Sequence, residues 1–132
     1  MSISFDNAFG IHEQAVTLRQ QRAELLAGNL ANADTPGYKA KDLDFKAALS
    51  AAQSKQSGMS LAQTSEGHLA ASLGLHPAAG FRNPDQPDTG DGNSVDVQVE
   101  RNLFLQNALE YQTSLQFLGG RIKGLMTAIK GE

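Results

Sequence analysis

The sequence predicts a mainly α-helical chain, in which two long terminal helices form an antiparallel coiled-coil pair around a small irregular or β-containing middle segment. Three observations lead to this fold class. Apolar residues recur at alternating spacings of three and four over residues 8–32 and again over residues 97–129. Residues 47–93 between them hold 3 of the 4 prolines and 6 of the 13 glycines. The chain of 132 residues is only 6% aromatic, which leaves little bulky material for a private core.

These patterns divide the chain into three parts. Residues 1–46 hold an N-terminal helix and a turn, residues 47–93 are a variable middle segment, and residues 94–132 hold a C-terminal helix. The first and third parts together are expected to form one coiled-coil domain, because each helix has a single apolar seam that it cannot bury alone.

The first helix is expected from about Phe9 to Asn32, with Leu26 and Leu30 flanking its seam. The seam itself consists of Ala8, Ile11, Ala15, Leu18, Arg22, Leu25, Asn29 and Asn32. The helix must end before Pro36, because the residue that precedes a proline is pushed out of helical geometry. Pro36 and Gly37 occupy the two central positions of a predicted type II turn, where the second needs a positive φ.

The middle segment is expected to be a loop or a small irregular lobe. Residues 60–64 and 68–72 have the composition of short strands, and residues 81–93 have turn chemistry throughout, so we expect an extended connector there.

The C-terminal helix has the more regular repeat. Its predicted seam is Val97, Arg101, Phe104, Ala108, Tyr111, Leu115, Leu118, Ile122, Leu125 and Ile129. Asp96 is the expected N-cap, and a short strand over residues 95–99 is the competing prediction. Gly119 and Gly120 interrupt the pattern, which indicates a tolerated kink or a close helix–helix contact.

Composition excludes several function classes. The formal charge of −3 does not favour nucleic-acid binding, and the absence of cysteine excludes disulfides and thiolate chemistry. His12, His68 and His76 have no metal-ligand spacing, and Asp85, Asp88 and Asp91 lack the closing glutamate of a calcium loop. We therefore expect no catalytic residue, no metal and no cofactor. The charged N-terminus lacks a signal-peptide core, and no apolar run is long enough to span a bilayer.

A longer motif identifies a family. The stretch Asn29-Leu30-Ala31-Asn32-Ala33-Asp34-Thr35-Pro36-Gly37-Tyr38-Lys39-Ala40 resembles the N-terminal signature of the axial proteins of the bacterial flagellum, which form its rod and hook. Tyr111-Gln112 lies in a segment similar to their C-terminal helix. The short length and the motifs at residues 42–45, 84–87, 91–101 and 122–126 resemble the short subunits of the proximal rod.

The resemblance implies a non-enzymatic structural subunit of the periplasmic rod, exported by the flagellar type III apparatus without a cleaved signal. It implies as partners the rod subunits FlgC and FlgF, further copies of the chain, the adaptor FliE and the export gate. The terminal segments of such proteins become helical on assembly. The alternative that the helical seams leave open is a cytosolic coiled-coil interaction or regulatory module.

The residues expected to form the assembly interface lie on the two seams and in the turn. They are Ile11, Leu18, Arg22, Leu25, Asn29, Leu30, Asn32, Pro36, Gly37, Tyr38, Phe104, Tyr111, Leu115, Leu118, Ile122 and Leu125.

Overall fold

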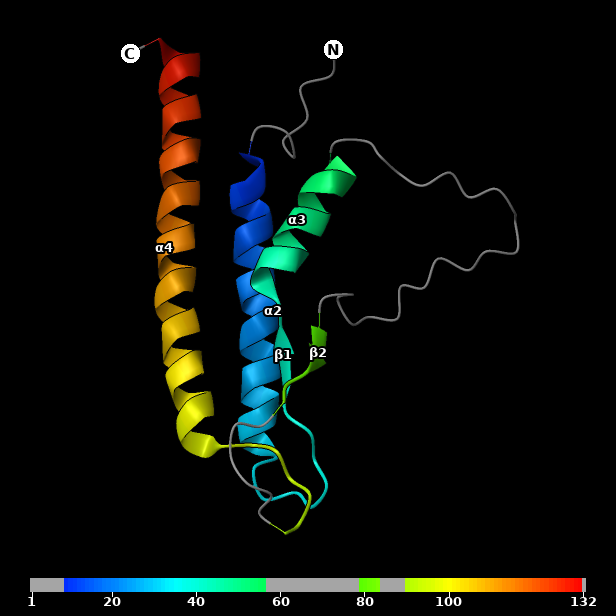
Figure 1. Ribbon diagram of the computed structural model, residues 1–132. Helices are drawn as coiled ribbons and strands as arrows, with labels where there is room; N and C mark the ends of the chain where they lie inside the picture. The colour runs from blue at the N-terminus through cyan, green and yellow to red at the C-terminus, as the bar shows by residue number, and fades with distance from the viewer. Residues whose placement is uncertain (1–8, 57–78, 84–89, 132) are drawn as a thin grey trace, which may run out of the picture.

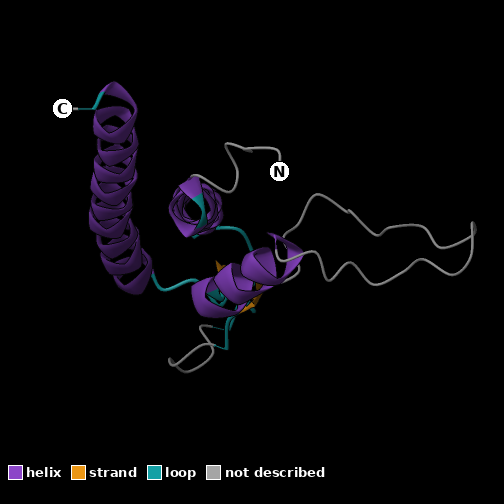
Figure 2. Cartoon of the chain, turned by 90° about the horizontal axis from the view of Figure 1, so that it is seen from above, coloured by secondary structure: helices purple, strands orange, loops and turns teal. Residues whose placement is uncertain are grey.

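The structure, a computed structural model, describes residues 9–56, 79–83 and 90–131. Its elements in chain order are α2 (Ile11–Ala31), β1 (Lys41–Leu43), α3 (Phe45–Gln56), β2 (Ala79–Phe81) and α4 (Val97–Lys130). Helices α2 and α4 pack side by side and run in opposite directions (Figure 1). Seen from above, α2 lies between α4 and α3 (Figure 2). The predicted fold class, with terminal helices packed together around a small two-stranded segment, is confirmed.

Helix α2 ends almost where the sequence predicts. The Asn32 side chain turns back and donates to the carbonyl of Gly28 at 2.8 Å, which satisfies a carbonyl at the end of the helix. The predicted type II turn follows: the Tyr38 amide donates to the Thr35 carbonyl at 3.2 Å, and Gly37 has a φ of 72°. The chain is thereby redirected from α2 into β1.

Strands β1 and β2 form a two-stranded antiparallel sheet, in which Lys41 pairs with Phe81 and Leu43 with Ala79. Helix α3 begins directly after β1, where the Asp44 carboxylate accepts the Ala47 amide at 3.0 Å. The expectation of a loop or irregular lobe from residue 47 onward is therefore wrong for its first ten residues. Alanine-rich sequence behind an aspartate cap favours helix, although its serines and glutamines resemble a linker. The suggested strands at 60–64 and 68–72 lie outside the described residues.

The small core lies between α2, β1 and α3. Its buried members are Leu18, Leu43 and Ala48, and the partly buried Leu25, Phe45, Leu49 and Ala79 pack against them. Two residues of the predicted α2 seam, Leu18 and Leu25, thus face the sheet and α3. The α2 seam is therefore divided: Leu18 and Leu25 pack against β1 and α3, whereas Asn29 contacts α4 through Glu100.

Helix α4 starts at the predicted cap. The Asp96 carboxylate accepts the amides of Gln98 and Val99 at 2.9 and 3.2 Å, so the competing strand prediction for residues 95–99 is wrong. The helix runs without interruption through Gly119 and Gly120, where an added Cβ would meet no atom within 4 Å. The predicted close helix contact at these glycines is therefore not made within the described part of the chain.

The most deeply buried residues of α4 are polar, which the sequence did not predict, although Leu103, Tyr111 and Leu118 beside them are half-buried. The buried residues are Glu100, Asn107 and Ser114, spaced seven apart. At 100° per residue, this row lies roughly 80° around the helix from the centre of the predicted apolar seam. Leu115 of that seam is 42% exposed and Ile129 is 84% exposed. One edge of the α4 seam is thus exposed and the other, with Tyr111, Leu118 and Leu125, is half-buried, because α2 and Arg82 directly after β2 supply partners for a polar row.

Candidate functional site

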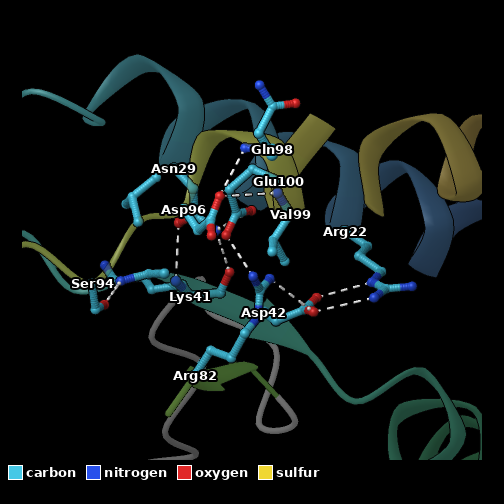
Figure 3. A network of polar contacts seen from close by, with 12 residues as sticks. Arg22, Asn29, Lys41, Asp42, Arg82, Ser94, Asp96, Gln98, Val99 and Glu100 are labelled. Atoms are coloured by element: carbon cyan, nitrogen blue, oxygen red, sulfur yellow. Dashed lines mark hydrogen bonds and ion pairs between the residues drawn. The ribbon is translucent and has the colours of Figure 1, made fainter. Parts of the chain in front are cut away.

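A buried polar junction joins α2, β1 and α4 through the first asparagine of the signature (Figure 3). The Asn29 Nδ2 donates to the Lys41 carbonyl at 2.7 Å and to Glu100 Oε2 at 3.0 Å. Its Oδ1 accepts the Lys41 amide at 2.9 Å and the Tyr38 hydroxyl at 3.3 Å. One fully buried amide therefore satisfies its donors and acceptor on three elements.

Four charged side chains extend this junction (Figure 3). The Arg22 guanidinium donates to both oxygens of Asp42, at 2.9 and 3.1 Å. Arg82 donates to Asp42 Oδ2 at 3.1 Å and to Glu100 Oε1 at 2.5 Å. The Glu100 side chain is fully buried, so its pairing with Arg82 and Asn29 offsets the cost of removing a charge from water. The two carboxylates and two guanidiniums alternate in one line from α2 to α4.

The ion pairs shift the pKa values of Arg22 and Asp42. Burial alone would raise the pKa of Asp42, but the hydrogen bonds from Arg22 and the Leu43 amide, with the charges of Arg22 and Arg82, outweigh it. The pKa of Asp42 therefore lies below its usual value. The hydrogen bond to Asp42 likewise raises the pKa of Arg22. Both groups are held in their charged forms.

Asn93 closes the signature turn from the other end of the chain. Its Nδ2 donates to the carbonyls of Asn32, Ala33 and Thr35, at 3.0, 2.8 and 2.9 Å. Its Oδ1 accepts the Val95 amide at 2.8 Å. These bonds hold the carbonyls at the end of α2, which have no partner within the helix.

Backbone pairing continues on both sides of Asn93. The Gly37 amide donates to the Asp91 carbonyl at 2.9 Å, and the Ser94 amide donates to the Tyr38 carbonyl at 3.0 Å. The Ser94 hydroxyl accepts the Ala40 amide at 2.8 Å. The signature and residues 91–95 thus form one hydrogen-bonded unit, which sets where α4 begins relative to α2.

A second polar group joins the helices nearer the start of α2. Arg19 forms an ion pair with Glu110 and donates to Ser114 Oγ at 3.1 Å, and its guanidinium lies 4.1 Å from the centre of the Phe45 ring. Asn107 donates to the Arg19 carbonyl at 2.9 Å. The α2–α4 contact is therefore held by specific polar partners along its length.

The predicted interface residues fall into two groups. Those engaged mainly within the chain lie on α2 and its turn: Leu18, Arg22, Leu25, Asn29, Asn32, Gly37 and Tyr38. Those exposed or partly exposed are Ile11, Leu30, Pro36, Phe104, Tyr111, Leu115, Leu118, Ile122 and Leu125.

Sequence reasoning missed the partners in the junction. Asp42, Arg82, Asn93, Glu100 and Asn107 were not among the predicted site residues. A readable signal existed for Glu100 and Asn107, because polar residues recur every seven positions at 100, 107 and 114. Arg82 carried no such signal, since it lies 40 residues from Asp42 in the chain.

One flank of α4, beside its buried polar row, carries an apolar stripe. We define the α4 stripe as Phe104, Leu115, Ile122, Met126 and Ile129, which are between 36% and 84% exposed. At 100° per residue they fall within an arc of roughly 60°. A row of exposed apolar side chains on one helix is a candidate interaction site.

The described residues do not contain a candidate metal site. Across residues 9–56, 79–83 and 90–131, no three His, Asp or Glu side chains are placed to hold a metal ion. None of the helices in these ranges is both long and apolar enough to cross a membrane. The junction is a closed set of mutually satisfied polar groups, and such an arrangement fixes geometry.

Comparison with known proteins agrees with the motif. Residues 9–39 match the family described as flagella basal body rod protein. A flagellar basal body rod protein FlgB of Aeromonas hydrophila is 58% identical over 132 residues, which cover 100% of this chain and 99% of that protein. The FlgB proteins of Escherichia coli and Salmonella typhimurium are 44% and 42% identical, covering 95% and 96% of this chain and 94% and 95% of theirs.

Proposed function

This chain belongs to the FlgB family of flagellar basal body rod proteins and is a structural subunit of the rod. We propose that contacts of its α4 stripe with neighbouring subunits hold it in the rod. The family assignment replaces the cytosolic regulator that the helical seams left open. The observation that carries the proposal is that the deeply buried residues of α4 are polar, while the apolar α4 stripe beside them remains between 36% and 84% exposed.

Burial explains why the stripe favours assembly. Moving a Leu, Ile, Phe or Met side chain from water into a packed interface contributes about 1.5–3 kcal/mol. Because the residues of the stripe are still partly in solvent, part of this free energy is gained only when a neighbouring subunit covers them. Because the α2–α4 pair is held by polar partners, α4 does not need its apolar stripe for intrachain packing.

The neighbours that we propose are the rod subunits FlgC and FlgF, further copies of this chain, the adaptor FliE and the export gate. The chain is proposed to reach them through the flagellar type III apparatus. The predicted interface residues that are exposed in the structure, among them Phe104, Leu115 and Ile122, supply the contacts. The signature turn residues act within the chain by setting the position of α4.

The experiment replaces Leu115 by aspartate in cells that carry no other copy. We expect loss of swimming and of completed rods, because an aspartate on the stripe would be buried without a partner between subunits. The protein should still leave the cytoplasm. Gln116→Asp is the matched control: it is exposed, one residue away and rotated about 100° from Leu115. Normal swimming of the Leu115→Asp strain would contradict the proposal.

A further inference from the structure

We infer that the outer edge of strand β2 is a docking site for an extended segment of a partner chain, which adds as a third strand and places a basic side chain over Gly80. This surface is separate from the α4 stripe, so the inference goes beyond the proposed function and does not depend on it. The direction of the backbone groups, an exposed ring and a hollow beside the strand carry it.

The two edges of the small sheet are occupied differently. On the side of β1, the carbonyl and the amide of Lys41 bond the Asn29 side chain, at 2.7 and 2.9 Å (Figure 3). Asn29 therefore closes this edge in the way that another strand would. The opposite edge belongs to β2, and β1 lies between β2 and α2 (Figure 1).

The register shows which backbone groups of β2 point outward. Residues of an antiparallel pair alternate between bonding each other and pointing away from each other. Phe81 lies opposite Lys41, whose backbone groups point to Asn29, so the amide and carbonyl of Phe81 point to the outer edge. The next amide, that of Arg82, points inward and donates to the Ala40 carbonyl at 2.8 Å.

Outward backbone groups of this kind fit an extended chain. Ala79 lies two residues before Phe81 and points outward like it, and the structure gives neither residue a backbone partner on this edge within residues 9–56, 79–83 and 90–131. An extended segment that pairs with both gains main-chain hydrogen bonds, which do not depend on its sequence. Unpaired edges of this kind are templates for another strand.

The Phe81 side chain adds apolar area at the same edge. It is 73% exposed, and the centre of its ring lies 5.8 Å from Lys41 Nζ. The side chain opposite Phe81 on an added strand would lie about 5 Å away and cover this ring. An apolar residue at that position therefore suits the site.

A hollow beside the strand defines the charge of the partner. It has a volume of 380 Å³, and its lining includes Gly80 and the charged side chains of Asp42, Asp44 and Arg82. Asp42 and Arg82 are already paired in the junction. Asp44 is exposed, and among the described residues its carboxylate bonds only the amide of Ala47, through Oδ1. The unmatched charge in the hollow is therefore negative, and a lysine or arginine complements it.

Gly80 leaves the way into the hollow open. A Cβ added to Gly80 would meet no atom within 4 Å. On an added strand, the residue opposite Gly80 points to the same face of the sheet, and a long basic side chain can extend past the glycine toward Asp44. The site thus fits an extended segment in which a basic residue lies between two apolar ones.

The first test fills the hollow in cells that carry no other copy. Gly80→Lys supplies a basic side chain from within the chain, which displaces that of the partner, so we expect rod yield to fall at least about tenfold. Gly80→Ala is the matched control, because its methyl group meets no atom within 4 Å and leaves the hollow open. Normal rod yield with Gly80→Lys would overturn the inference.

A second pair of variants tests the charge. Asp44→Asn keeps an oxygen for the Ala47 amide, so α3 retains its cap, but the negative charge is lost. We expect rod yield to fall about threefold or more. Asp34→Asn, at an exposed aspartate of the signature turn, is the control and should leave the yield unchanged. An unchanged or higher yield with Asp44→Asn would contradict a basic partner.

Hydrogen exchange tests the addition of a strand directly. In the purified chain, the Phe81 amide should exchange faster than the Arg82 amide, which is bonded to Ala40. In purified basal bodies from a swimming strain, the Phe81 amide should exchange at least about tenfold more slowly than in the free chain, because it is then paired. Equal exchange in the two samples would overturn the inference. So would a disulfide between two Gly80→Cys chains in basal bodies, because β2 would then pair with β2 of a second copy.

Protection of the Arg82 amide in each purified variant shows whether the sheet is intact. If Gly80→Lys loses this protection, the exchange of Phe81 in the unmodified protein decides the question. If the Leu115→Asp strain lacks rods while Gly80→Lys and Asp44→Asn assemble normally, the strand site is wrong and the proposed function stands.

Discussion

The side-chain amides of Asn29 and Asn93 connect the two ends of the chain, and each does so by satisfying groups that a helix end or a strand edge leaves open. Asn29 bonds both backbone groups of Lys41 and also Glu100. The Asn93 amide donates to carbonyls of the turn that follows α2, those of Asn32, Ala33 and Thr35. Buried amides with several partners are specific in position, because a shift by one residue leaves them unsatisfied.

Replacing Asn93 by alanine removes the two N–H donors that its Nδ2 shares among the carbonyls of Asn32, Ala33 and Thr35, at a residue that is 6% exposed. Two lost hydrogen bonds, at about 0.5–1.5 kcal/mol each, make local opening about ten- to a hundredfold more frequent. Hydrogen exchange of the Gly37 and Ser94 amides in the purified protein measures this. Asn102→Ala, at an exposed position on α4, should leave both amides unchanged. Equal exchange in the two variants would contradict the role given to Asn93.

The ion pair of Asp42 predicts a loss of stability in acid. The pKa of Asp42 is lowered in the folded chain. The ion pair therefore contributes its full stability above about pH 4, the usual pKa of an aspartate, and this contribution is lost as the pH falls through the lowered pKa. We expect the Arg82 amide, which donates to the Ala40 carbonyl, to exchange faster in that acid range after correction for intrinsic rate. In the Asp42→Asn variant, the Arg82 amide should already exchange faster at neutral pH, and its exchange should change little further in acid. A wild-type amide that is insensitive to pH there would argue against the pairing.

At the scale of elements, the terminal helices and the signature turn could be predicted from the sequence, whereas α3 could not. Repeats of three and four residues identify a helix wherever they extend over many turns. Helix α3 spans only Phe45–Gln56, and its exposed residues resemble a linker; its identity depends on the Asp44 cap and on packing of Ala48 against Leu18. The three-residue strands β1 and β2 are too short for any alternation to identify them.

Glycines in α4 and in the signature turn should respond in opposite ways to alanine. Gly119→Ala and Gly120→Ala add a Cβ that meets nothing within 4 Å in the chain, and each should favour helix by about 1 kcal/mol. Gly37→Ala should destabilise the turn, because its φ of 72° disfavours an L side chain. Circular dichroism of the purified variants gives the helix content. A decrease for the two α4 variants would indicate that these glycines have a role within the chain that the structure does not explain.

At the scale of the whole molecule, the sequence predicts the antiparallel pairing of α2 and α4, but it does not predict which face of α4 lies against α2. The sequence shows which residues of α4 share a face, yet the choice between an inward and an outward stripe depends on side chains far away in the chain. Arg82 and Asn29 provide partners for Glu100, and this makes a polar row the better inward face. The role of Asn93 could not be predicted for the same reason, because its partner Thr35 lies 58 residues away in the sequence. Consequently α4 presents apolar surface outward, as a subunit of a larger assembly requires.

The central claim, that the α4 stripe is covered by neighbours in the rod, is tested most directly by thiol labelling. The chain contains no cysteine, so Leu115→Cys introduces a single reactive probe at a side chain that is 42% exposed. We predict rapid reaction with a maleimide in the free subunit and strong protection in purified basal bodies from a swimming strain. Equal labelling of the subunit and the basal body would contradict the account, because the stripe would then remain in solvent after assembly.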